Sequence, residues 1–138
     1  RKSGAGFCVV MADLDNFKLI NDNYGHLFGD KILKLFARLL TDKTRSTDFV
    51  ARFGGEEFIL ILPETSIENA FIVTENIRKA VEKLQVRNTK TGDVIEAMTS
   101  SFGIAAHRFD ESANDLVDRC DTALYKAKQT GRNKTVKS

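Results

Sequence analysis

Four acidic residues in two short segments of the sequence have the types and spacing of a catalytic site. Asp13 and Asp15 end an apolar stretch, and Glu56 and Glu57 follow two consecutive glycines. In an extended chain Asp13 and Asp15 point to the same side. Converging carboxylates repel each other unless a cation lies between them, and an all-oxygen site of this kind suits Mg²⁺ bound together with substrate phosphates.

Each of these carboxylates also has an ordinary structural role open to it. Asp15 or Asn16 is a plausible N-cap for the helix that follows, a role worth about 1 kcal/mol, and for Asp15 we favour that role. For Asp13 with Glu56, the pattern alone leaves a metal site and a solvated turn equally open.

The elements that must position these residues follow from the hydrophobic periodicity and the turn signals. We predict strands over 6–13, 48–53, 56–64 and 94–106, a short final strand over 133–137, and helices over 16–25, 29–44, 66–84 and 112–131. Residues 88–93 are expected to form a turn-rich connection. The order β-α-α-β-β-α-β-α-β combines a hairpin with crossover helices, so we expect an α/β fold whose central, mostly antiparallel sheet is flanked by helices.

Composition narrows the class of protein. The chain has 138 residues, of which 42% are hydrophobic and 29% charged, as in one ordinary globular domain. No apolar run approaches the roughly 20 residues of a membrane span, and a net charge of +2 does not indicate nucleic-acid binding. Cys8 and Cys120 lie in apolar surroundings, which favours buried thiols in a reducing, cytoplasmic compartment.

Four segments together resemble one family. The residues RFGGEEF (52–58) are similar to the signature of the GGDEF family of diguanylate cyclases, in its GGEEF form. DLDNFKLINDNYGHLFGDKIL (13–33), SFGIA (101–105) and ALYKAKQTGRN (123–133) resemble the family's other blocks in the same order. The resemblance covers nearly the whole of residues 1–138 as a single domain.

This resemblance implies a palm-like fold, related to nucleotide cyclases and polymerases, that condenses two GTP into cyclic di-GMP with release of pyrophosphate. Two protomers, each holding one GTP, would meet as a homodimer. The resemblance also implies two Mg²⁺ ions per active site, with Mn²⁺ as a substitute, held by Asp13, the Leu14 carbonyl and Glu56. Glu56 would assist deprotonation of the 3′-hydroxyl, with Glu57 beside the metals.

The remaining roles follow the same resemblance. Lys18 would be a catalytic residue that contacts the phosphates. Lys128 and Arg132 would contact them too, and we expect this pair, four residues apart, to lie at a helix end. Gly54 and Gly55 would let the nucleotide approach the hairpin closely. Asn21 and Asp30 would read guanine; without the resemblance we would favour a helix-closing role for Asn21 and a dipole role for Asp30 at a helix N-terminus. Three aromatic or imidazole residues are expected to be structural: Phe17, His26 and Tyr125.

A second site is implied near residue 45. Arg45 and Asp48 match the family's Arg-x-x-Asp site for inhibition by the product, which we favour over a surface ion pair. Asn76 and Arg78 are both candidates to complete it. The family's domain usually opens with a helix that precedes Arg1, so we expect a fragment of a longer regulatory protein. The alternative to a cyclase is a non-catalytic module that binds GTP or cyclic di-GMP.

Overall fold

A five-stranded mixed sheet forms the centre of the protein. The computed structural model describes residues 6–87, 91–92, 94–95 and 98–138. The strands lie in the order β2-β3-β1-β6-β7, and their bounds are β1 Cys8–Leu14, β2 Phe49–Arg52, β3 Glu57–Leu62, β6 Ser100–Ala106 and β7 Thr135–Lys137. All neighbouring pairs are antiparallel except β6 with β7. The expected α/β fold with a mostly antiparallel sheet is confirmed.

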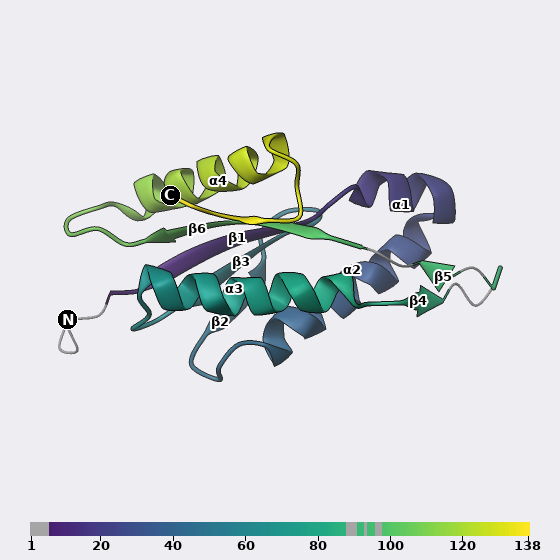
Figure 1. The fold of residues 1–138 in the computed structure, drawn as a ribbon, viewed down its shortest axis with the longest axis horizontal. Coiled ribbons are helices and arrows are strands. Elements are labelled where there is room, and N and C mark those ends of the chain that lie inside the picture. The colour runs from purple at the N-terminus through teal and green to yellow at the C-terminus, as the bar shows by residue number, and fades with distance from the viewer. Residues whose placement is uncertain (1–5, 88–90, 93, 96–97) are drawn as a thin grey trace.

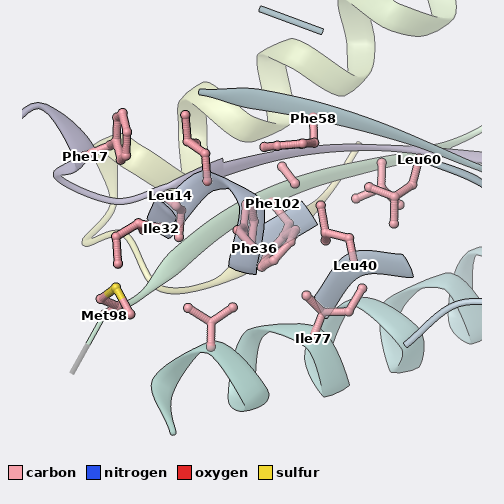
Figure 2. Close-up of a cluster of buried hydrophobic side chains, with 14 of the residues drawn as sticks. Leu14, Phe17, Ile32, Phe36, Leu40, Phe58, Leu60, Ile77, Met98 and Phe102 are labelled. Carbon is pink, nitrogen blue, oxygen red and sulfur yellow. The ribbon is translucent and has the colours of Figure 1, made fainter. Parts of the chain in front are cut away.

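Helices cover both faces of this sheet (Figure 1). In the described residues they are α1 Phe17–Tyr24, α2 His26–Asp42, α3 Ile67–Glu82 and α4 Ala113–Gln129. Side chains alternate along β1, so Val10 and Ala12 join the core beneath α2 and α3, whereas Val9 and Met11 pack under α4. The larger core includes an edge-to-face pair of Phe36 and Phe58 (Figure 2).

Local sequence signals account for helices α3 and α4. The side chains of Ser66 and Ser112 cap α3 and α4 by accepting hydrogen bonds from the backbone N–H groups of Asn69 and Asp115. Burial of Ile77 and Val81 in α3, and of Leu116, Cys120 and Leu124 in α4, follows the helical period. Both cysteines are buried free thiols, as expected.

The predicted element order is wrong at one point. The strand predicted over 94–106 is divided into β5 (Val94–Ile95) and β6, and β5 pairs with an unpredicted short strand, β4 (Val86–Arg87). Four of the positions in the turn-rich connection 88–93 lie outside the described residues. The observed order is therefore β-α-α-β-β-α-β-β-β-α-β. Two-residue strands carry too little periodicity to be recognised in a sequence.

Two of the three side chains expected to be structural are not packed in the core. Phe17 is buried, but His26 is exposed at the first position of α2 and Tyr125 is 64% exposed on α4. An aromatic residue on an amphipathic helix is often buried, yet here Tyr125 lies outside the inward-facing stripe of α4.

Candidate active site

The acidic residues meet at one end of the central strands. Asp13, next to last in β1, lies directly opposite Glu57, the first residue of β3. Opposed residues of antiparallel strands project their side chains from the same face. Glu56 precedes β3 in the turn and acts electrostatically on Asp13. The structure thus brings together the three carboxylates that the sequence singled out in separate segments.

Burial and mutual repulsion disfavour ionisation in this cluster. Asp13 is only 3% exposed. Burial raises the pKa of Asp13 to about 7, with Glu56 adding to the increase and Lys128 opposing it. Burial also raises the pKa of Glu57, and the nearby Asp13 carboxylate adds to that increase. A cation bound here would relieve both effects.

The structure already places one cation in this cluster. The ammonium group of Lys128 on α4 forms an ion pair with Oδ2 of Asp13. Burial alone would lower the pKa of Lys128, but its bond to Asp13 and the charges of Glu57 and Glu56 raise it. Oδ1 of Asp13 is buried and accepts no hydrogen bond from the described residues.

The oxygen donors fit a divalent metal that arrives with a nucleotide. Among the described residues, no three His, Cys, Asp or Glu side chains already form a metal cluster. Mg²⁺ is commonly held by one or two carboxylates plus substrate phosphates, so a full protein cage is not required. The unpartnered Oδ1 of Asp13 and the facing Glu57 supply such carboxylates, and Leu14 follows at the end of β1.

Neither the backbone conformation nor the packing of the Gly54–Gly55 turn requires glycine at these two positions. Neither glycine has a positive φ. A Cβ at Gly55 would meet nothing within 4 Å, and one at Gly54 would meet only Oε1 of Glu57, at 3.6 Å. Other residues would therefore be accommodated, so the absence of side chains keeps the backbone of the turn open to a ligand.

Arg52, the last residue of β2, supports this turn and was not singled out from the sequence. Its Nε donates to the carbonyl oxygens of Gly54, at 3.3 Å, and Gly55, at 2.9 Å. These bonds hold the turn against the end of β2. An arginine immediately before the Phe-Gly-Gly segment was the available signal.

Asn21 in α1 and Asp30 in α2 lie on either side of the junction between these two helices. Asn21 lies against Gly29, where a Cβ would overlap its Oδ1 atom, and that oxygen is buried with no hydrogen-bond partner in the described residues. Asp30 follows Gly29 and lines a cleft of about 400 Å³ whose other walls include Lys34, Arg52 and Phe58.

The competing structural roles for this pair are not observed. Because α2 begins at His26, three residues before the predicted start, Asp30 lies beyond its first turn and away from the N-terminal end of the helix dipole. α1 is closed by the backbone of Asn21, whose carbonyl accepts from the Gly25 N–H, and not by the side-chain amide of Asn21.

Lys18 is exposed on α1.

The expectation that Lys128 and Arg132 are related by helical spacing at the end of the last helix is wrong. α4 ends at Gln129, and the chain then reverses through Gly131 and Arg132 with φ values of 117° and 62°. The N–H of Arg132 donates to the carbonyl of Ala127, at 2.9 Å. Lys128 and Arg132 therefore flank a turn, and their relative position is set by that turn rather than by helical spacing.

The predicted N-cap role of Asp15 is also wrong. Asn16 occupies the N-cap position of α1, with a left-handed backbone and no side-chain cap. The Asp15 carboxylate is buried and instead accepts hydrogen bonds from Thr99, Ser101 and the Asn133 backbone. Partners more than 80 residues away carry no local signal, so the sequence favoured the nearest helix.

Arg45 and Asp48 form a closed unit at the opposite end of β3. Nη2 of Arg45 donates to Oδ1 of Asp48 at 2.8 Å, to the Pro63 carbonyl at 2.9 Å and to the Thr65 hydroxyl at 2.8 Å. The side chain of Asp48 is 2% exposed, whereas that of Arg45 is 55% exposed. The pair is thus built into the chain while one face of the guanidinium remains open to solvent.

The two residues suggested to complete that second site differ in their surroundings. Arg78 turns inward from α3, where its guanidinium binds both oxygens of Glu75 at 2.8 Å and Oδ1 of Asn133 at 3.0 Å. Asn76 is exposed. Of the two, only Asn76 is available to a ligand at the surface.

Comparison with known proteins agrees with this arrangement. The model of the family described as "Diguanylate cyclase, GGDEF domain" matches residues 1–134. Diguanylate cyclase VdcA of Vibrio cholerae is 40% identical over 134 residues, covering 97% of this chain and 40% of that protein. Diguanylate cyclase A of Treponema denticola is 45% identical over 131 residues, covering 94% of this chain and 34% of that protein. The chain thus spans less than half the length of these relatives.

Solved structures show the same fold. The GGDEF domain of DgcB from Caulobacter crescentus in complex with c-di-GMP has a TM-score of 0.94 and 32% identity, covering 99% of this chain and 80% of that one. The active GGEEF domain of a diguanylate cyclase from Vibrio cholerae has a TM-score of 0.88 and 35% identity, covering 99% of this chain and 85% of that one.

In the part of the chain that the structure describes, no helix has the length and apolarity needed to cross a membrane.

With the family model matched over nearly all of its residues and the palm-like fold shared with solved GGDEF domains, this chain belongs to the GGDEF family of diguanylate cyclase domains.

Proposed function

We propose that this domain is a diguanylate cyclase that condenses two GTP molecules into cyclic di-GMP and two pyrophosphates. The observation that carries the proposal is the buried Asp13 facing Glu57, with Glu56 and Lys128 beside it and an open glycine turn in front. Relatives about 40% identical over this segment are named diguanylate cyclases. Degenerate binding modules would be expected to lack one of these carboxylates, and none is missing.

The proposed chemistry assigns each group one task. In each half-reaction the 3′-hydroxyl oxygen of one GTP attacks the α-phosphorus of the other, the bond to the β-phosphate oxygen breaks, and pyrophosphate leaves. Glu56 accepts the hydroxyl proton. Two Mg²⁺ ions, or Mn²⁺ in their place, would be held by Asp13, the Leu14 carbonyl and Glu56, with Glu57 adjacent, and would stabilise charge on the reacting oxygens.

The cationic side chains neutralise the triphosphate before and during the attack. Lys18 and Arg132 are exposed, so they are free to contact phosphate oxygens. Lys128 is held by Asp13, and a metal bound at that carboxylate would free its ammonium group to contact the phosphates. Gly54 and Gly55 leave room for the nucleotide at the turn.

Turnover requires two copies of the domain, because one site holds a single GTP. We propose that a homodimer brings the two nucleotides face to face, and that other parts of a longer chain, including a regulatory domain, control this meeting. The relatives' greater length supports the second part of this proposal.

The test is an incubation of concentrated protein with GTP and Mg²⁺, followed by chromatography and mass spectrometry of the products. Cyclic di-GMP or its linear intermediate is expected, with activity per protein molecule rising as the protein concentration rises. GTP binding without either product, in a protein shown to dimerise, would overturn catalysis in favour of a binding module.

Substitution of Asp30 by Ala should relax the choice of base. A carboxylate accepts from the ring N–H and the exocyclic amine of guanine, whereas adenine offers no matching pair of donors. Loss of two such bonds should reduce the preference for GTP over ATP by roughly a hundredfold. Competition binding with both nucleotides measures the ratio. Full discrimination against ATP in the variant would contradict the assignment of Asp30.

Substitution of Arg45 by Ala should weaken binding of cyclic di-GMP at the proposed inhibitory site by about tenfold while leaving GTP binding intact. The structure adds a second expectation, a loss of about 1 kcal/mol in stability, because Arg45 also holds the Pro63 carbonyl and Thr65. Calorimetry with each nucleotide checks the first and urea unfolding the second. Arg108→Ala, at an exposed arginine in the loop between β6 and α4, is the matched control.

A further inference from the structure

The buried carboxylate of Asp15 connects three segments that are remote in the sequence. Its Oδ1 accepts from the Ser101 hydroxyl at 2.6 Å, and its Oδ2 accepts from the Thr99 hydroxyl at 2.7 Å and from the Asn133 N–H at 3.0 Å. Asp15 is 7% exposed. It is not among the groups that shift the pKa values of Asp13 and Glu57.

The bond to Asn133 acts on a turn that needs support. Gly131, Arg132 and Asn133 have φ values of 117°, 62° and 47°, and two such residues in succession are costly when neither is glycine. A turn of this kind persists only when the surrounding structure holds it. The hydrogen bond from Asn133 to a carboxylate is charge-assisted and therefore stronger than a neutral one.

The side chain of Asn133 holds the same turn from the other side. Its Nδ2 donates to Oε2 of Glu82 at 2.7 Å, and its Oδ1 accepts from Arg78 at 3.0 Å. The turn is thus clamped between α3 and the end of β1. It is also the segment that carries Arg132 and directly follows the last turn of α4, where Lys128 lies.

The strand on the other side of this contact carries the acidic residues. Asp15 follows Asp13 and Leu14 in the chain, and its own N–H is fixed by the Thr99 carbonyl at 2.9 Å. The Asp15 side chain therefore ties the end of β1, with the carboxylates, to the turn after α4, with the cations, and the Ser101 hydroxyl oxygen also accepts from the same Asn133 N–H, at 3.2 Å.

We infer that Asp15 is a positioning residue that sets the distance between the metal-binding carboxylates and the phosphate-binding cations, an inference that rests on the proposed function. Its effect on a nucleotide is transmitted through the Asn133 backbone to Lys128 and Arg132. The effect must therefore grow with the number of phosphates on the ligand, and a merely structural role would show no such dependence.

Calorimetry of Asp15→Ala with two ligands tests this dependence. The ligands are GMP and a GTP analogue with a methylene group between the α- and β-phosphates, which cannot react. Loss of a charge-assisted hydrogen bond should weaken the analogue by about tenfold and GMP by less than about threefold. Equal weakening of the two ligands, or no weakening, would overturn the inference.

Two further variants separate positioning from folding. Thr99→Val removes one hydroxyl donor to the same carboxylate but leaves the Asn133 contact, so both affinities should stay within about twofold of the parent. Asp15→Asn keeps an uncharged acceptor and should weaken the analogue by about threefold, again more than GMP. If Asp15→Ala does not unfold cooperatively, the affinities of Asp15→Asn for the analogue and for GMP test the inference in its place. Failure of the unsubstituted protein to bind the analogue would instead overturn the proposed function itself.

Discussion

Substitution of Glu56 by Gln should lower the rate of cyclic di-GMP formation by roughly a thousandfold, because it removes the carboxylate that we propose as a metal ligand and as the base. The amide has nearly the same shape, and Glu56 is only partly buried in the turn before β3. Loss of its charge also removes a repulsion that raises the pKa of Asp13. The fold should therefore be retained, with a melting temperature equal to or slightly above that of the parent.

Product formation from GTP and Mg²⁺, measured beside a thermal melt of the same sample, checks both expectations. Glu68→Gln provides the matched control, since Glu68 is exposed in the first turn of α3. Turnover at the parent's rate in Glu56→Gln would contradict the proposed roles of Glu56 as a metal ligand and as the base. A lost rate together with a lost melting transition would show a structural role instead.

Substitution of Gly103 by Ala should destabilise the protein by about 3 kcal/mol or more. Gly103 lies in β6 directly beneath α4, where an added Cβ would overlap the carbonyl oxygen of Cys120 and the backbone nitrogen of Leu124. Both obstacles are backbone atoms of a helix, so a change of rotamer cannot relieve the overlap and α4 must move away from the sheet. That movement would also displace Lys128 from Asp13.

The midpoint of urea unfolding measures this loss. Gly55→Ala is the matched control, because the added methyl group meets nothing within 4 Å and the backbone has no positive φ there. Its stability should stay within about 0.5 kcal/mol of the parent, whereas its affinity for GTP should fall. A parent-like midpoint for Gly103→Ala would mean that α4 does not lie so close to β6.

Local patterns in the sequence were sufficient for most elements and for the three clustered carboxylates. α3 and α4 begin after serine caps and bury one apolar stripe, and β1 and β3 are short apolar runs, so each is specified by neighbours within a few residues. The four segments that resemble the GGDEF family, RFGGEEF among them, indicated the family for the same reason, since the residues within each segment are consecutive. The roles of the predicted site residues stay predictions until the variants above are measured.

Only the tertiary structure decided what the polar side chains bind. Asp15 was predicted to cap the adjacent helix, yet its partners at 99, 101 and 133 are brought to it by the pairing of β1 with β6 and by the turn after α4. Lys128 reaches Asp13 across 115 residues. A helix cap or an apolar stripe is decided by the nearest few residues, whereas the partner of a buried charge is decided by which segments the sheet places side by side, and that choice depends on the whole chain at once.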